Sequence, residues 1–211
     1  MNFPLQTGRT GRIMLPCVTG NVRCRAPISR YNSFMRKNAG PLQKEREEQV
    51  QLEGSVILRP MTPQDFDEVH DLWMTIQGFG IRSLDDGKED VTRFIKRNPT
   101  TSVVAVSDGR IVGSILCGND GRQGCLYHVC VEKQFRRMGI GTQMVGYCMR
   151  ELRELGINKV TLVAFKRNDG GNAFWRKIGW KKREDFNYYE FVLNEKNITK
   201  FIGADQSTMV Q

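Results

Sequence analysis

Residues 131–142 read Val-Glu-Lys-Gln-Phe-Arg-Arg-Met-Gly-Ile-Gly-Thr and join two segments of different periodicity. Residues 125–132 before the turn have the apolar character of a strand, whereas 139–155 carry apolar side chains at helical spacing and stop at Gly156. A glycine-containing turn that opens a helix leaves backbone N–H groups without helical partners. These donors and the positive end of the helix dipole favour a phosphate-bearing ligand.

Two common phosphate-binding motifs are excluded here. A Walker loop needs a Gly-Lys-Ser/Thr triplet, which the sequence lacks. A dinucleotide fingerprint needs a third small residue after Gly139 and Gly141, but Met144 stands at that spacing. That fingerprint also follows an early strand of a parallel pattern, whereas this turn follows an expected antiparallel hairpin. Arg136 and Arg137 add positive charge to a phosphate site of another kind.

The hydrophobic pattern on both sides of this turn predicts alternating strands and helices. Asp108-Gly109 is a strong signal for a two-residue hairpin turn, and Thr62-Pro63 is typical of a helix start. The expected strands are 56–58, 102–106, 110–117, 125–132, 159–165 and 188–193; the expected helices are 62–77, a short one ending before Pro99, 139–155 and 168–178; and 78–88 is an expected loop.

Arg136-x-x-Gly139-x-Gly141 resembles the Arg/Gln-x-x-Gly-x-Gly/Ala signature of the GNAT superfamily of acyl-CoA N-acyltransferases. The preceding strand His128–Val131 and the downstream segment Asn168–Trp180 are similar to that family as well. The resemblance covers residues 55–193. It implies an α/β (α+β) fold with a mixed central sheet of about six to seven strands, splayed central strands, and helices on both faces.

The resemblance also implies acetyl-CoA as co-substrate. Its pantetheine arm would lie between the strand ending at Val131 and the strand 159–165, and backbone amides of the turn would hold the pyrophosphate. The residues expected to bind it are Val129, Cys130, Val131, Arg136, Arg137, Met138, Gly139, Ile140, Gly141, Thr142, Asn168 and Trp175.

Acyl transfer to an amine needs a base for the amine proton and a proton for the leaving thiolate. Some relatives place a carboxylate early in the central strand, but Cys125 stands at that position. We therefore expect His128 to act as the base, since a histidine ordinarily ionises close to neutral pH. Glu132 could act through water or simply be solvated at the strand end. The alternative for His128 is a partly buried histidine with a structural role.

The source of the proton for the thiolate stays open at this point. Many relatives carry a tyrosine where Trp175 stands, and an indole N–H is not a practical acid. Tyr127, Tyr147 or water could replace it, or the thiolate could leave without an acid. Trp175 could equally be a core aromatic residue beside Phe174.

The expected function is acetyl transfer to a primary amine by direct attack in a ternary complex. The acceptor could be a small amine, a lysine or a peptide N-terminus. Asp85 and Asp86 in the loop 78–88 would suit a cationic acceptor, although either residue could simply be solvated. A non-catalytic acyl-CoA-binding sensor or scaffold is the alternative function, and the chain could be a monomer or a homodimer.

Charge and cysteine usage narrow the remaining function classes. The net charge is +9, but residues 1–40 hold seven basic and no acidic residues, so residues 41–211 carry only +2. This balance argues against a nucleic-acid partner. No apolar run reaches the roughly 20 residues of a membrane span. The six cysteines form no C-x-x-C pair, so no metal site is expected, and apolar runs around Cys117, Cys130 and Cys148 indicate core positions in a reducing, cytoplasmic setting.

The ends of the chain lie outside the resemblance. Residues 1–50 predict a disordered or mis-assigned basic tail and linker, with Met35 as an alternative start. An organelle transit peptide is the other interpretation, which the scattered Pro and Gly residues disfavour. Residues 194–211 are expected to form a C-terminal tail.

Overall fold

A computed structural model describes residues 56–203, so the expectations for residues 1–50 lie outside the described part of the chain. Within it, strands and helices alternate as the hydrophobic pattern predicts. The strands are β1 (Val56–Pro60), β2 (Gly80–Arg82), β3 (Val103–Ser107), β4 (Arg110–Asn119), β5 (Gly124–Val131), β6 (Val160–Leu162) and β7 (Thr199–Phe201). The helices are α2 (Phe66–Thr75), α3 (Lys88–Arg97), α4 (Ile140–Glu154) and α5 (Asp169–Lys177), with short 3-10 turns at Pro63–Asp65 and Lys133–Phe135.

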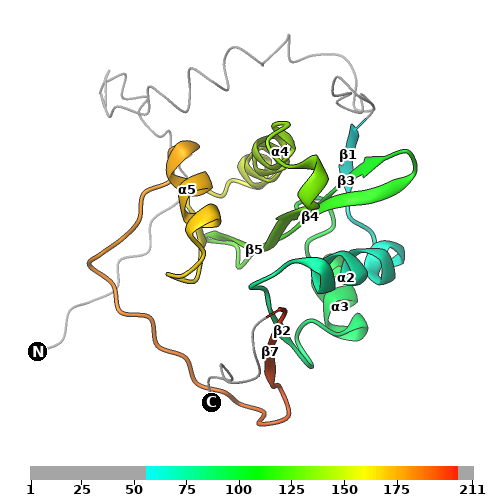
Figure 1. Ribbon diagram of the computed structural model, residues 1–211. Helices are drawn as coiled ribbons and strands as arrows, with labels where there is room; N and C mark the ends of the chain where they lie inside the picture. Colours follow the sequence, from blue (N-terminus) through cyan, green and yellow to red (C-terminus); the bar gives the residue numbers. More distant parts are fainter. Residues whose placement is uncertain (1–55, 204–211) are drawn as a thin grey trace, which may run out of the picture.

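Five strands form one mixed sheet in the order β1-β3-β4-β5-β6 (Figure 1). The hairpin between β3 and β4 turns at Asp108-Gly109, where both residues adopt positive φ as a tight turn requires. Among the described strands of this sheet β6 is the only one paired in parallel, and it pairs with β5 as far as Leu126 and Leu162 but no further. β5 continues to Val131. The predicted splay between these strands is therefore confirmed.

Helices cover both faces of the sheet, and each face has its own core. On one face α4 packs on the sheet through Met144, Cys148 and Leu152, all at most 1% exposed. On the other face α2 and α3 pack through residues such as Trp73 and Ile95. Cys117, Cys130 and Cys148 are buried, as predicted. The α/β fold class with helices on both faces is confirmed. The central sheet has five strands rather than the six to seven expected, because β2 and β7 form a separate two-stranded pair.

A polar cluster fixes the start of the first helical segment. Asp65 accepts hydrogen bonds from Thr62 N–H at 2.7 Å and Thr62 Oγ1 at 3.0 Å. The Arg59 guanidinium donates to both of its carboxylate oxygens at 2.7 Å. Burial alone would raise the pKa of Asp65, but the hydrogen bonds from Arg59 and Thr62 outweigh it and hold the pKa below its ordinary value.

This cluster predicts a pH-dependent contribution to stability. Because the folded-state pKa of Asp65 is lowered, its stabilisation is present above the unfolded-state pKa and is lost as pH falls through the folded value. We expect Asp65→Asn to lower the free energy of unfolding by about 1 kcal/mol at pH 7. Urea titrations should show the gap to the parent narrowing below about pH 4. A gap independent of pH would contradict this assignment.

The C-terminal part differs from the expectation. Residues 188–193 form no strand; residues 181–196 are exposed, and they stand off the domain between α5 and β7 (Figure 1). Instead β7, in the stretch expected to be a tail, pairs antiparallel with β2 in the predicted loop 78–88. Alternating apolar residues predicted a strand at 188–193, but a strand also needs a neighbouring edge, and no strand in the described part of the chain pairs with these residues.

Within residues 56–203, no helix is both long and apolar enough to cross a bilayer.

Candidate functional site

β5 contains an irregularity next to its separation from β6. The pairing with β4 shifts so that Tyr127 lies opposite Leu116 and Cys130 opposite Ser114, which leaves two residues of β5 opposite Ile115. His128, in this bulge, has a φ of 46°, which is uncommon for a residue with a Cβ. Bulges and strained residues of this kind cluster at functional sites.

The bulge turns the His128 side chain toward the α2 face of the sheet. Its ring centroid lies 4.4 Å from that of Trp73 and 5.5 Å from that of Phe79. Trp73 is itself fixed, because its Nε1–H donates to Ser114 Oγ at 2.9 Å. Ser114 also contacts Cys130 Sγ at 3.4 Å, and burial raises the pKa of Cys130 to about 11. His128 therefore rests on a packed polar and aromatic floor.

Asp86 reaches the same ring from the loop after β2. Its Oδ1 lies 2.6 Å from His128 Nε2, and the two side chains are 10% and 14% exposed. Its Oδ2 accepts the backbone N–H of Arg82 at 2.7 Å. Both carboxylate oxygens are therefore engaged. Asp86 is therefore not the solvated or acceptor-attracting charge that the sequence pattern had suggested.

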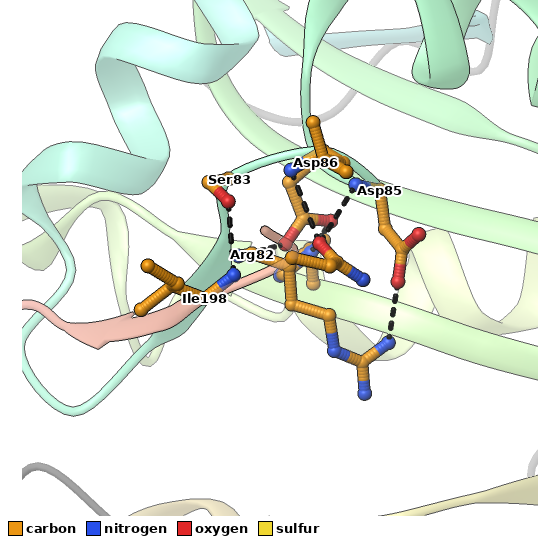
Figure 2. Close-up of polar contacts among 8 residues, drawn as sticks. Arg82, Ser83, Asp85, Asp86 and Ile198 are labelled. Atoms are coloured by element: carbon orange, nitrogen blue, oxygen red, sulfur yellow. Dashed lines mark hydrogen bonds and ion pairs between the residues drawn. The ribbon is translucent and has the colours of Figure 1, made fainter. Parts of the chain in front are cut away.

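The segment just before β7 holds the loop that carries Asp86 (Figure 2). Ser83 Oγ donates to the Lys196 carbonyl at 2.6 Å and accepts the Ile198 N–H at 2.9 Å. Asn197 Oδ1 accepts the N–H groups of Leu84 and Asp85 at 3.1 and 3.3 Å. The Asp85 carboxylate pairs with the Arg82 side chain at 3.3 Å. The contacts of Ser83, Leu84 and Asp85 with residues 196–198 link segments more than 100 residues apart. No local sequence pattern could reveal them.

The turn before α4 has the backbone geometry that a phosphate needs. Arg137 and Gly139 adopt left-handed φ values of 67° and 83°. Within the described residues, the N–H groups of Arg137, Met138 and Gly139 make no hydrogen bond, and the helix ladder starts with Gln143 N–H to the Gly139 carbonyl. The N–H groups of Ile140, Gly141 and Thr142 precede that bond. Such a run of free donors at a helix start forms an anion-binding concavity.

The strand beyond the splay presents its backbone next to this turn. Val129 and Val131 pack toward the α4 face, whereas Cys130 is buried on the α2 face. Arg136 Nε donates to the Val131 carbonyl at 2.9 Å and so ties the turn to the strand end. The unpaired edge of β5 and the free amides of the turn are therefore continuous. This arrangement fits an extended ligand that ends in a pyrophosphate.

Asn168 directly precedes α5, and Trp175 lies within it. Both residues are on the other side of the splay between β5 and β6. Asn168 Oδ1 accepts the Gly171 N–H at 2.9 Å and caps the helix. The Trp175 ring centroid lies 5.0 Å from Phe174 and 4.9 Å from Trp180, and all three rings pack against the α4 core. The contacts of Trp175 are those of a core aromatic residue.

Glu132 lies apart from the Asp86–His128 pair. Its Oε2 is 2.7 Å from an Arg110 guanidinium nitrogen, and its Oε1 accepts from Gln134 Nε2 at 3.1 Å. Its backbone N–H bonds to Val112 of β4. Its contacts thus close the end of β5 against β4.

The two tyrosines proposed as proton donors differ in position. Tyr127 follows the start of β5 and packs edge-on against Phe94 of α3 at 5.9 Å between ring centroids. Burial raises the pKa of Tyr127 well above its ordinary value. Tyr147 lies in α4, where burial raises its pKa to about 12. Both hydroxyls stay protonated at neutral pH, and the raised values make each a weak acid.

Known proteins resemble this chain over most of its described residues. Residues 66–180 match the family model described as the Acetyltransferase (GNAT) family. An acetyltransferase of Sodalis glossinidius is 28% identical over 127 residues, which cover 60% of this chain and 88% of the relative. One of Pectobacterium atrosepticum is also 28% identical, over 59% of this chain and 86% of its own length.

Solved structures show the same fold at lower identity. Ard1 from Thermoplasma volcanium superposes with a TM-score of 0.51 at 23% identity, over 59% of this chain and 82% of that one. The PaiA N-acetyltransferase from Thermoplasma acidophilum, solved with coenzyme A, gives 0.53 at 16% identity, over 60% and 90%. Because the family model spans more than half of the chain, this protein belongs to the acetyltransferase (GNAT) family and is an N-acetyltransferase with acetyl-CoA as co-substrate.

Proposed function

We propose that this enzyme transfers the acetyl group of acetyl-CoA to a primary amine by direct attack within a ternary complex. The observation that carries the proposal is the continuous path from the free amides at Arg137–Gly139, along the unpaired edge of β5, to His128 in the bulge of the same strand. A small amine, a lysine side chain or a peptide N-terminus fits the reaction class.

The turn and the strand edge orient the co-substrate. Amides from Arg137 to Thr142 hold the pyrophosphate, and the backbone of Val129 and Val131 pairs with the pantetheine arm. Asn168 and Trp175 border the arm from the α5 side. Acetyl-CoA supplies a thioester whose C–S bond breaks as the new C–N bond forms. Holding both reactants in place can account for several kcal/mol of the barrier.

His128 is the proposed base. Since Nε2 faces Asp86 Oδ1, Nδ1 is the nitrogen left to accept a proton from the attacking amine, directly or through one water. The ring would then be an imidazolium in contact with the Asp86 carboxylate. The thiolate leaves as such or takes a proton from water. Glu132, tied to Arg110, is retained only as a second, water-linked candidate.

The acceptor end of the site is bordered by the contact between the loop after β6 and the strand β7. The ring centroids of Phe165 and Phe201 lie 5.2 Å apart, and Arg167 stacks on both rings. A shallow hollow of about 250 Å³ lies among Phe165, Lys166, Arg167 and Phe201. With Asp85 and Asp86 already paired, we extend the acceptor class to amines that also carry an aromatic or anionic group.

The test is release of free coenzyme A from acetyl-CoA in the presence of an acceptor panel. The panel contains small alkyl and aryl amines, free amino acids, lysine, and peptides with a free N-terminus. Turnover with at least one class is expected, and mass spectrometry should find the acetyl group on nitrogen. Tight acetyl-CoA binding without turnover across the panel would instead favour a binding module.

Four free cysteines among the described residues support a cytoplasmic location in this proposal.

A further inference from the structure

We infer that Asp86 is a positioning residue that fixes His128 in the tautomer with the proton on Nε2. This inference rests on the proposed function, because it assigns Nδ1 as the atom that receives the amine proton. Asp86 comes from the loop after β2 and His128 from β5, so only the tertiary fold brings them together.

The geometry leaves one consistent arrangement of protons. Asp86 Oδ2 accepts the Arg82 N–H at 2.7 Å, which fixes the orientation of the carboxylate. The remaining oxygen, Oδ1, lies 2.6 Å from His128 Nε2 and can only accept from a neutral ring when ionised. Nε2 must therefore carry the proton of the neutral ring. Trp73 packs against the ring at 4.4 Å between centroids and so restricts its rotation.

β7 contributes to this arrangement from the end of the chain. Ser83 and Asn197 hold the loop at four hydrogen bonds, and β2 pairs with β7 from Gly80 to Arg82. Arg82 is thus both the last paired residue of β2 and the donor that orients Asp86. The position of the carboxylate depends on a strand about 115 residues further along the chain.

Asp86→Asn tests the inference by a signal that packing alone would not move. The asparagine has one oxygen, and the Arg82 N–H requires it; its NH2 group then faces Nε2 and forces the proton to Nδ1. The chain has only two histidines, so nitrogen–proton correlation spectra with His70→Ala as the assignment variant resolve the His128 ring. The parent should show the Nε2–H tautomer, and Asp86→Asn the Nδ1–H tautomer with turnover at least about tenfold lower.

Asp85→Asn is the matched control, because Asp85 is the adjacent carboxylate, is 51% exposed and pairs through that carboxylate with the Arg82 side chain. It should keep the parent tautomer. A parent ring with the proton on Nδ1, or an unchanged tautomer in Asp86→Asn, would overturn the inference. Should the tautomer change with turnover intact, the positioning role stands and the base role of His128 falls.

A second inference comes from the exposed segment between α5 and β7. Six of its eight residues at positions 186–193 are apolar or aromatic, and they are 51–94% exposed. Within the described residues, the backbone of 186–193 makes no hydrogen bond. Tyr189, Phe191 and Leu193 alternate and would share one face of an extended strand. Such a segment has the composition and conformation of a strand without a partner.

The described part of the fold also contains a strand edge without a partner. β6 pairs only with β5, so its outer edge presents free N–H and C=O groups among residues 56–203. Apolar side chains continue beyond it, since Val163 is 70% and Phe165 is 44% exposed. We propose that residues 186–193 of one copy pair with the β6 edge of a second copy, and reciprocally, to form a two-fold dimer.

The area involved is sufficient for a stable dimer. Three large side chains per copy offer roughly 450 Å². With the matching surface on the partner and two equivalent sites, the total approaches roughly 1,800 Å², within the range of stable interfaces. Both ends of the segment are fixed on their own domain, by α5 and by the Asn197–loop contacts, while the middle stands away from that domain (Figure 1).

Light scattering of the full chain during size-exclusion chromatography tests this dimer. At tens of micromolar the parent should elute at twice its 24.2 kDa mass. Phe191→Pro removes a backbone donor and should give a monomer that still binds acetyl-CoA, whereas Phe191→Tyr keeps the donor and should stay dimeric. A monomeric parent would overturn the proposal, and this is the result expected if the segment pairs with β6 of its own chain. A dimer that survives Phe191→Pro would also overturn it.

Discussion

His128→Ala is expected to lower turnover by about 10²-fold, the usual contribution of a positioned base, with little change in the affinity for acetyl-CoA. Affinity should hold because the co-substrate contacts proposed here come from backbone groups of the turn and the strand edge. Steady-state kinetics and isothermal titration calorimetry measure the two quantities separately. The variant also leaves Asp86 buried without its partner, so a lower melting temperature is expected as well.

His128→Asn controls for the backbone, because asparagine tolerates the left-handed φ of this position better than most residues. It should lose turnover like alanine. His70→Ala controls for removal of a histidine near Trp73, since His70 only stacks on Phe66 at 5.4 Å and contacts Trp73 edge-on. It should keep turnover. Full activity in folded His128→Ala would leave water as the base.

Gly139→Val should weaken acetyl-CoA binding by about tenfold or more. Gly139 has a φ of 83°, and a β-branched residue there costs roughly 1–3 kcal/mol or forces the turn to change. A changed turn would redirect the free amides that are proposed to hold the pyrophosphate. About 1.4 kcal/mol corresponds to a tenfold change in affinity. Calorimetry with acetyl-CoA and with coenzyme A measures it.

Gly156→Val is the matched control, because Gly156 has a similar φ of 76°, and a Cβ there meets nothing within 4 Å. The two variants should lose comparable stability, but only Gly139→Val should lose affinity. Gly141 is less suited to this test: its φ is not left-handed, and an added Cβ would lie 3.5 Å from Phe174, an ordinary contact. Equal affinities in Gly139→Val and Gly156→Val would place the pyrophosphate elsewhere.

The sequence by itself determined the elements that depend on local preferences. Asp108-Gly109 specified a tight hairpin, Thr62-Pro63 a helix start, and the apolar spacing of α4 a helix whose first turn has free amides. These features follow from backbone sterics, capping and periodicity, which act over a few residues. The family could be predicted for the same reason, since its signature is a short segment around that turn.

Only the tertiary structure decided what surrounds His128. The bulge between Tyr127 and Cys130 arises from the register with β4, and Asp86 comes from a loop 42 residues away. The loop is placed by β7, which the sequence pattern assigned to a tail, while the alternating residues 188–193 form no strand and pair with none of the strands within residues 56–203. Strand pairing is a non-local interaction, so alternation indicates a possible strand but not its neighbour. An edge is needed to satisfy its backbone groups, and only the folded chain provides that edge.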